Sequence, residues 1–514
     1  MGREAPVSTA VRIPRELQEF LHLPGPQTLL LRGPPGSGKT TLSLALLEAF
    51  KGDKILVTSR VPNQELHREF PWLGNNGGRS IRVIDTSGMD ESVHDVARTL
   101  RRSREFLLET RPVEEREASE FLWLPPPLQE AWSSLSEEKP SLVVIDSWDA
   151  LVESFLGGLS DPETPGPVPD RSDIERLLIR RMSKAPAHLA FVLEREDQTT
   201  LDYLVNGVVV TRRETADQRL TRWMSLLKLR GVRIENPNYP FSLEGARFEG
   251  ILPLEPYQSL RPGAPDPESE PLPGFIWPGS RDFASSFGRL PIGKITLLEV
   301  DEDASADIPN LLCLPVVAHV LGLGGRVLLV PHTTENPYDI WESLNGSVPR
   351  ARFISQVRML VPPGPVPKGK EDFYRAVLPL QRPEPGAPPQ NIEDAEAIRF
   401  LMEGATERSP GLIVISLPGL IGIAQAMNLP LAPEVLTRIP EAFQTATKAG
   451  PFHMILVGRK GSSLLDPLRA VASMRLVMNI QQGRIFVHGA APWTPKFVLT
   501  EGSQGRPYQL LRVV

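Results

Sequence analysis

The chain has 514 residues, which is too long for one ordinary hydrophobic core and predicts two or three domains at about 150 residues each. Its 41% hydrophobic and 23% charged residues are typical of a folded soluble protein, and its formal net charge of -6 provides no general basic field for nucleic-acid binding. The single cysteine, Cys313, excludes an intrachain disulfide, and together with an amino terminus that lacks an apolar signal-peptide core it predicts a cytoplasmic protein.

A strand, a glycine-rich turn and a helix are predicted in that order near the amino terminus. The apolar run TLLL predicts the strand, GPPGSGKT the turn, and TTLSLALLEAF the body of the helix. The glycines allow the main chain to wrap closely around an anion, which the free N–H groups and the positive end of the helix stabilise. The turn residues expected to contact phosphate are Gly33, Gly36, Ser37 and Gly38. The pattern therefore predicts a nucleotide phosphate site.

Three residues at the start of the predicted helix complete this site. Lys39 is placed to neutralise the β and γ phosphates, Thr40 to bring its hydroxyl to Mg²⁺, and Thr41 to lie near the α phosphate. Farther along the chain, the apolar run LVVI predicts a buried strand ending at Asp146, whose carboxylate is placed to hold the metal's water shell opposite Thr40. ATP with Mg²⁺ is the expected ligand. The alternative for Asp146 is a carboxylate that only caps the strand end.

An arginine-rich segment, SVHDVARTLRRSREFLLET at 92–110, has the spacing of an amphipathic helix with a basic face. A solvated surface is the favoured interpretation, because Glu105 and Glu109 are interleaved with the arginines. Contact with nucleic acid is the weaker alternative.

Proline, glycine and acidic residues dominate 255–280, which predicts a semi-extended linker. On either side of it, four apolar, β-rich runs recur in the same order. The matched pairs are TLLLRG with ITLLEVD, KILVTSRVP with RVLLVPHTTENP, SLVVIDS with GLIVISL, and HLAFVLERE with HMILVGRKG. Short apolar strands separated by helical segments predict a mostly parallel sheet with helices on both faces. We therefore predict an α/β protein with two such domains, 1–254 and 281–514.

The segment 409–433 carries no charge and is long enough to cross a bilayer. Pro418 and the polar residues Ser416, Gln425 and Asn428 argue against a membrane span. We interpret the segment as a buried strand followed by a loop and a helix, and we expect no membrane association.

With the run IDSWDAL at 145–151, the first half resembles the RecA-like ATPases, and within them the KaiC and RadA group, whose metal-binding strand similarly ends in an Asp-Ser pair. The segments 201–214, 219–231 and 236–251 are similar to the closing strands of a KaiC-type domain. Two other segments, IPRELQEFL and SRVPNQELHREFPWL, resemble the archaeal gas vesicle protein GvpD family, which implies regulation of gas-vesicle expression. The near balance of 62 acidic and 56 basic residues fits a non-halophilic relative.

The resemblance also implies two residues that act on a neighbouring subunit. In the KaiC and RadA group, the lysine and arginine of a KLRG motif reach the nucleotide of the next copy, so Lys228 and Arg230 are implied to contact its γ phosphate. A solvated pair at a strand end is the alternative. The implied role requires face-to-face assembly.

One departure from the RecA-like pattern follows the second strand. These enzymes usually place a glutamate there to activate the attacking water, whereas this chain has Ser59 and Arg60. Arg60 is permanently charged and cannot act as a base, although it could stabilise the γ phosphate. Glu194 is the nearest substitute by strand order. The sequence therefore predicts a weak ATP hydrolase.

The second half lacks the chemistry of a phosphate loop. Its positions matched to Gly33, Lys39 and Asp146 are Asp301, Asp307 and Ser416, respectively. Carboxylates thus stand where phosphates would need N–H groups and a cation, so this loop should repel ATP. We predict a degenerate RecA-like domain kept for packing or partner binding.

Taken as a whole, these features favour an ATP-binding regulatory protein that acts through a protein partner. A DNA recombination or repair ATPase of the RadA type is the alternative, and it requires a basic DNA path. A third hypothesis treats ATP as a structural ligand that only raises stability.

Overall fold

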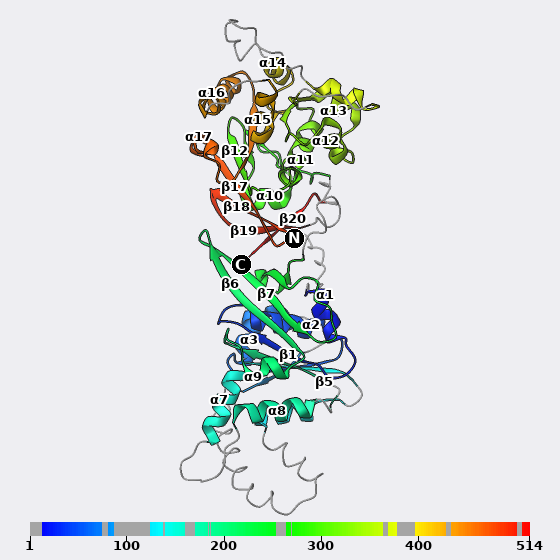
Figure 1. The fold of residues 1–514 in the computed structure, drawn as a ribbon, viewed down its shortest axis with the longest axis vertical. Helices are drawn as coiled ribbons and strands as arrows, with labels where there is room; N and C mark the ends of the chain where they lie inside the picture. The colour runs from blue at the N-terminus through cyan, green and yellow to red at the C-terminus, as the bar shows by residue number, and fades with distance from the viewer. Residues whose placement is uncertain are drawn as a thin grey trace, which may run out of the picture. The chain divides into compact units, whose positions relative to one another are not determined.

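The chain forms two α/β units, each built around one large sheet (Figure 1). The computed structural model describes residues 13–74, 81–86, 124–136, 139–159, 170–182, 185, 187–252, 264–268, 270–362, 368–377, 396–427, 433–500 and 506–513. The units are Met1–Leu252 with Val513–Val514, and Pro253–Arg512. The arginine-rich segment 92–110 lies outside the described residues.

The first unit contains a sheet whose strands are β1 (Thr28–Arg32), β2 (Asp53–Thr58), β3 (Arg82–Asp85), β4 (Ser141–Asp146), β5 (Ala187–Leu193), β6 (Gly207–Ala216), β7 (Arg219–Leu229), β8 (Asn238–Ser242) and β9 (Glu249–Gly250). Their order in the sheet is β3-β2-β4-β5-β1-β6-β7-β8-β9. Neighbours from β3 to β6 pair in parallel, and those from β6 to β9 pair antiparallel. The parallel strands are short apolar runs because helices cover both of their faces.

Helices of the first unit are α1 (Arg15–Leu21), α2 (Lys39–Ala49), α3 (Asn63–Glu69), α6 (Pro126–Ser133), α7 (Trp148–Leu159), α8 (Arg171–Met182) and α9 (Thr200–Leu204), with short 3-10 turns at Pro71–Gly74 and Glu244–Ala246. One core joins α1, α2 and α3 to one face of the sheet, and includes Leu31 of β1 and Leu46 of α2. The other core joins α6, α7, α8 and α9 to the opposite face. There, Trp148 of α7 meets Phe191 of β5 edge-on, with 5.1 Å between ring centroids.

The second unit contains β10 (Phe275–Ile276), β11 (Leu290–Pro291), β12 (Ile295–Val300), β13 (Val327–Val330), β14 (Val357–Met359), β15 (Gly411–Ser416), β16 (Phe452–Arg459), β17 (Met474–Gln481), β18 (Arg484–Ala491), β19 (Trp493–Thr500) and β20 (Gln509–Arg512). Its large sheet has the order β14-β13-β15-β16-β12-β17-β18-β19-β20. Strand for strand, this is the order of the first unit, with the same change from parallel to antiparallel pairing after β17. The prediction of two RecA-like α/β sheets is confirmed.

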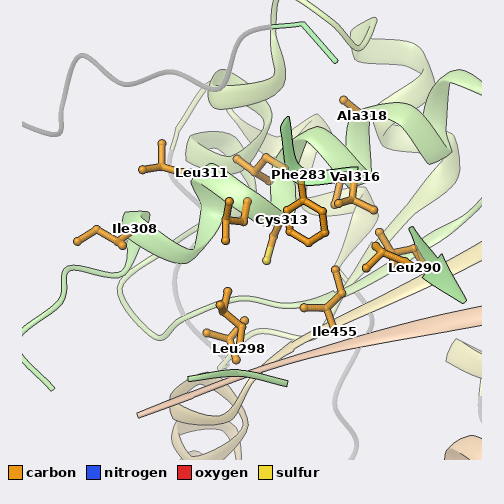
Figure 2. Close-up of a cluster of buried hydrophobic side chains, with 14 of the residues drawn as sticks. Phe283, Leu290, Leu298, Ile308, Leu311, Cys313, Val316, Ala318 and Ile455 are labelled. Carbon is orange, nitrogen blue, oxygen red and sulfur yellow. The ribbon is translucent and has the colours of Figure 1, made fainter. Parts of the chain in front are cut away.

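Helices of the second unit are α10 (Arg281–Phe287), α11 (Asp307–Gly322), α12 (Pro337–Leu344), α13 (Arg350–Gln356), α14 (Glu396–Met402), α15 (Leu417–Ala426), α16 (Pro433–Ala449) and α17 (Asp466–Val471), with 3-10 turns at Glu371–Ala376 and Ser463–Leu465. Figure 2 shows part of the core in which α11 packs on the sheet. Cys313 of α11 lies there among Phe283, Leu298 and Ile455, so the thiol is buried in an apolar environment.

Part of the segment predicted as a linker belongs to the second unit. Phe275–Ile276 pairs antiparallel with Leu290–Pro291. Trp277 is buried, and its indole N–H donates to the carbonyl of Asp266 at 2.9 Å. Ordered packing in this unit therefore begins before Arg281.

The uncharged segment 409–433 contains a buried strand and a helix, but the loop expected between them is absent. Strand β15 leads directly into α15, because the Ser416 hydroxyl caps the helix by accepting the N–H of Gly419 at 3.4 Å. Within the described residues, no helix is both long and apolar enough to cross a membrane.

A buried histidine joins three strands of the second unit. His453 of β16 is completely buried; its Nδ1–H donates to the carbonyl of Pro291 at 2.8 Å, and its Nε2 accepts from the Thr296 hydroxyl at 3.1 Å. Burial lowers the pKa of His453 to about 4. Burial likewise lowers the pKa of His319 on α11 to about 4. Both imidazoles are therefore neutral in the folded unit at pH 7.

We expect acid to destabilise the second unit. The folded pKa of His453 lies below the value of about 6.5 for an unfolded histidine, so its contribution is fully present above pH 6.5 and is lost as the pH falls toward 4. The loss is about 3 kcal/mol for this residue. Urea unfolding at several pH values, followed by hydrogen exchange in β12 and β16, measures it. The same pH dependence in His453→Gln would contradict this assignment.

Candidate nucleotide-binding site

The predicted phosphate loop connects β1 to α2. Its backbone has a φ of +71° at Gly36 and +94° at Gly38, values in the left-handed region that favours glycine. Lys39 directly follows and begins α2. The free N–H groups of the first helical turn therefore face the region that the loop encloses, which is the geometry of an anion site.

Strand β6 lies against this loop. The hydroxyls of Ser37 in the loop and Thr211 in β6 are 2.7 Å apart and share a hydrogen bond, and both side chains are buried. A Cβ atom on Gly33 would lie 2.2 Å from the carbonyl oxygen of Thr211, so only glycine fits there. Sequence reasoning missed Thr211, which is 174 residues from Ser37 and carries no local signal.

Lys39 lies buried inside the loop. Its ammonium donates to the carbonyl oxygens of Gly33 and Pro34, both at 2.8 Å. Burial lowers the pKa of Lys39, and the nearby carboxylates of Glu194 and Asp146 oppose that shift. The ammonium is thus held where phosphate oxygens could replace two neutral acceptors.

Thr40 and Asp146 meet beside Lys39. The Thr40 hydroxyl donates to the Asp146 carboxylate at 2.7 Å, which brings the start of α2 to the end of β4. Burial raises the pKa of Asp146, while the Thr40 hydrogen bond and the charge of Lys39 act against this rise. Among the described residues, no group of three or more His, Cys, Asp or Glu side chains could hold a metal. One hydroxyl and one carboxylate fit Mg²⁺, which usually takes few protein ligands and completes its shell with phosphate and water.

Ser59 fastens the end of β2 to the end of β4. Its N–H donates to the carbonyl of Asp146 at 2.9 Å. Its hydroxyl accepts the N–H of Ser147 and donates to the carbonyl of the same residue, both at 3.0 Å. The residue that follows β2 therefore has a structural role that a carboxylate could not fill in the same way.

Arg60 and Glu194 form an ion pair across the site. Arg60 follows β2 and has a side chain that is 51% exposed, whereas Glu194 follows β5 and is 21% exposed. Both act electrostatically on Lys39 and on Asp146. The structure thus brings Glu194, the nearest substitute for the missing glutamate, together with Arg60, which follows the second strand where that glutamate was expected.

A buried carboxylate holds the backbone at Glu194. Asp149 of α7 accepts the N–H of Glu194 at 3.0 Å and the guanidinium of Arg171 at 2.6 Å. Arg171 also donates to Glu175 of α8 at 2.7 Å. Hydrogen bonds to buried charges restrict motion of the groups they join. This network, which sequence reasoning missed, fixes the end of β5 to α7 and α8.

Lys228 and Arg230 lie away from the phosphate loop of their own chain. Leu229, between them, pairs with Gly207 at the start of β6, whereas the loop follows the other end of the neighbouring parallel strand β1. The ammonium of Lys228 donates to the carbonyl of Asp202 at 3.0 Å, and Arg230 is exposed. A contact with nucleotide could therefore come only from another copy.

The matching loop of the second unit has different chemistry. Between β12 and α11, the Asp301 carboxylate accepts the N–H of Ile480 at 2.8 Å. The guanidinium of Arg459 donates to the carbonyls of Asp301 and Ala304 at 2.9 and 2.7 Å. Ser416, at the end of β15, caps a helix and offers no carboxylate. The second unit therefore has no lysine at the position matched to Lys39 and no carboxylate at the end of β15.

The first unit has the elements of a P-loop domain in a RecA-like fold: a strand, a glycine-rich turn, a helix that begins with lysine and threonine, and an acid at a neighbouring strand end. Residues 17–229 match the family model described as GvpD gas vesicle protein, P-loop domain. The first unit is therefore similar to the P-loop domain of GvpD gas vesicle proteins.

Two proteins of Halobacterium salinarum are similar over much of the chain. Protein GvpD2 is 29% identical over 356 residues, which cover 66% of this chain and 65% of that protein. Protein GvpD1 is 26% identical over 343 residues, which cover 65% of this chain and 59% of that protein. The chain thus spans less than two thirds of the length of these relatives.

The close approach of Gly33 to β6 predicts a strong effect of a single methyl group. We expect Gly33→Ala to lower the free energy of unfolding of the first unit by about 2 kcal/mol or more, because the new Cβ would overlap the Thr211 carbonyl. Gly157→Ala in α7 is the control, since nothing lies within 4 Å of its Cβ position and alanine favours the helix. Thermal unfolding measures both, and equal stability of the two variants would refute the expected clash.

Proposed function

We propose that the first unit binds ATP with Mg²⁺ and hydrolyses it slowly, and that a protein partner responds to the nucleotide state, so that the chain acts as a regulator. The observation that carries this proposal is the buried Lys39 ammonium inside the glycine loop, next to the Thr40–Asp146 hydrogen bond. Burial disfavours the charged form of Lys39. A buried ammonium in this position is therefore best explained by a bound anion that stabilises its charge.

Nucleotide binding follows from an exchange of acceptors at Lys39. Phosphate oxygens would replace the carbonyls of Gly33 and Pro34, and hydrogen bonds between charged groups are stronger than those to neutral carbonyls. Thr40 and Asp146 would hold the metal, Thr40 through its hydroxyl and Asp146 through water. Mg²⁺ supplies positive charge that offsets the charge of the phosphates.

Slow hydrolysis is supported by the residues that follow β2 and β5, on the side of the loop where the γ phosphate would lie. Ser59 is engaged with Ser147 and cannot deprotonate water. Glu194 is the remaining candidate base, and Arg60 holds its carboxylate in an ion pair. A paired carboxylate must separate from its guanidinium, or share it, before it can accept a proton from water.

The regulatory part of the proposal rests on the contrast between the two units. Their sheets have one strand order, but the loop of the second unit carries Asp301 and is bound by Arg459 of β16, in place of phosphate-binding chemistry. A unit that keeps its core without that chemistry is suited to contact a protein. The similarity to proteins named for gas vesicles points to gas-vesicle formation as the process, and the lone cysteine fits a cytoplasmic location.

The lysine in the loop gives the direct test of nucleotide binding. We expect Lys39→Ala to weaken ATP binding about 10- to 100-fold, because the phosphates lose a charged hydrogen-bond donor. Lys51→Ala is the matched control, since Lys51 is exposed beyond the other end of α2. Isothermal titration calorimetry with Mg²⁺ present measures both. Equal affinity of the native protein and Lys39→Ala would refute the proposed site.

A second variant tests the proposed base. We expect Glu194→Gln to lower kcat for ATP about 100-fold, the usual scale of general-base catalysis, with the Kd for ATP changed by less than about threefold. The exposed neighbour Glu196→Gln should keep kcat. Single-turnover phosphate release measures the rate, and an unchanged kcat in Glu194→Gln would remove this residue as the base. Strong acceleration by single-stranded DNA would instead support a recombination ATPase.

A further inference from the structure

Two arginines lie directly opposite each other on the β6–β7 hairpin, beside the phosphate loop. Arg213 of β6 pairs in register with Arg222 of β7. Arg213 lies two residues beyond Thr211, on the strand face that contacts the loop. Its Nη1 atom is 3.5 Å from the position that a Cβ on Gly36 would occupy. A cation from a distant part of the chain therefore reaches the loop.

Carboxylates do not neutralise this pair. Within the described part of the chain, Arg213 forms no ion pair, and the buried Nε and Nη1 atoms of Arg222 have no hydrogen-bond partner. Burial, together with the charge of Arg213, lowers the pKa of Arg222. The neighbouring Arg212 is paired with Glu214 at 3.1 Å, and both lie on the alternate face of β6.

Such an arrangement costs stability unless an anion is present. Like charges directly opposite each other on adjacent strands repel, and buried guanidinium N–H groups without acceptors are unfavourable. A phosphate group that accepts hydrogen bonds from Arg213 would relieve the repulsion between the two positive charges. The pair therefore has the chemistry of an anion subsite.

The sheet order indicates which part of a nucleotide this subsite would meet. Strand β1 lies between β5 and β6. Asp146 and Glu194, which belong to the metal and γ-phosphate side, follow β4 and β5 on one flank of the loop. Arg213 lies on the other flank, on β6. A nucleotide whose terminal phosphate meets the first flank extends its nucleoside toward the second.

We propose that Arg213, with Arg222 behind it, binds the α-phosphate and ribose end of the nucleotide. This inference rests on the proposed function of the loop, and it adds a same-chain contact that does not distinguish ATP from ADP. Arg213 is the contacting residue, and Arg222 supplies a second positive charge across the strand pair.

The test compares ATP and ADP binding in matched variants. We expect Arg213→Ala to raise the Kd of ATP and of ADP by the same factor, about 10-fold, because both ligands carry an α phosphate. Arg213→Lys should keep part of the affinity. Arg212→Ala, on the other strand face, should bind both ligands within about twofold of the native protein, because its guanidinium points away from the loop. Calorimetric titrations measure all four proteins.

A measurement without nucleotide separates binding from structure. Because Arg213→Ala removes the repulsion with Arg222, its melting temperature without ligand should equal or exceed that of the native protein, while the increase caused by ADP should shrink. A lower melting temperature with unchanged affinity would overturn the proposal and assign a structural role to Arg213.

The remaining outcomes are also decisive. A loss confined to ATP would overturn the proposal, because it would place Arg213 at the γ phosphate. Unchanged affinity for both ligands in Arg213→Ala, with normal binding by the native protein, would overturn this inference alone. Failure of the native protein to bind either nucleotide would overturn the proposed function and the inference with it.

Discussion

The site depends on the placement of β1 between two parallel neighbours. Arg32, the last residue of β1, pairs in register with Leu193 of β5 and with Val210 of β6. The next residue of each strand is therefore at the same level, and these residues are Gly33, Glu194 and Thr211. Hydrogen bonding within the sheet thus fixes an acid on one side of the loop and a close backbone contact on the other. The glycines determine the shape of the phosphate loop, whereas the register of β1 with β5 and β6 determines which residues surround the loop.

Residues with local signals were predictable from the sequence, and those that depend on register were not. The phosphate loop and Asp146 each follow an apolar run that reads as a strand, and Glu194 follows from the order of such strands. Thr211 and Arg213 belong to a hairpin whose pairing with a loop about 175 residues away has no local signature. The fold was also predictable from local signals, because each apolar run indicates a strand and the two series of runs indicate two sheets. The direct passage from β15 to α15 was missed because Ser416 serves as both strand end and helix cap.

Comparison of the two loops shows that one strand order can carry two different loop chemistries. In the first unit, a lysine of the loop itself donates to loop carbonyls, and its flexible stem lets it turn to another acceptor. In the second unit, the planar guanidinium of Arg459, which belongs to a different strand, donates to the carbonyls of Asp301 and Ala304. That contact occupies two carbonyls of the loop, and the Asp301 carboxylate lies 4.0 Å from the ammonium of Lys460. The apolar strands determine the sheet, whereas a few residues after the first strand determine whether an anion can enter.

The Arg60–Glu194 pair suggests what limits turnover if ATP is the ligand. Arg60 would have two possible anionic partners, the Glu194 carboxylate and the γ phosphate, and it cannot neutralise both equally. With Arg60 on Glu194, the carboxylate is held back from water; with Arg60 on the phosphate, Glu194 is free beside Lys39. Hydrolysis would then require the guanidinium to change partner. Because Asp149 and Arg171 fix the backbone of Glu194 while Arg60 remains half exposed, the arginine is the member able to move. A candidate base, Glu194, is already at the site. The exchange of Arg60 between Glu194 and the γ phosphate would therefore limit the rate of hydrolysis.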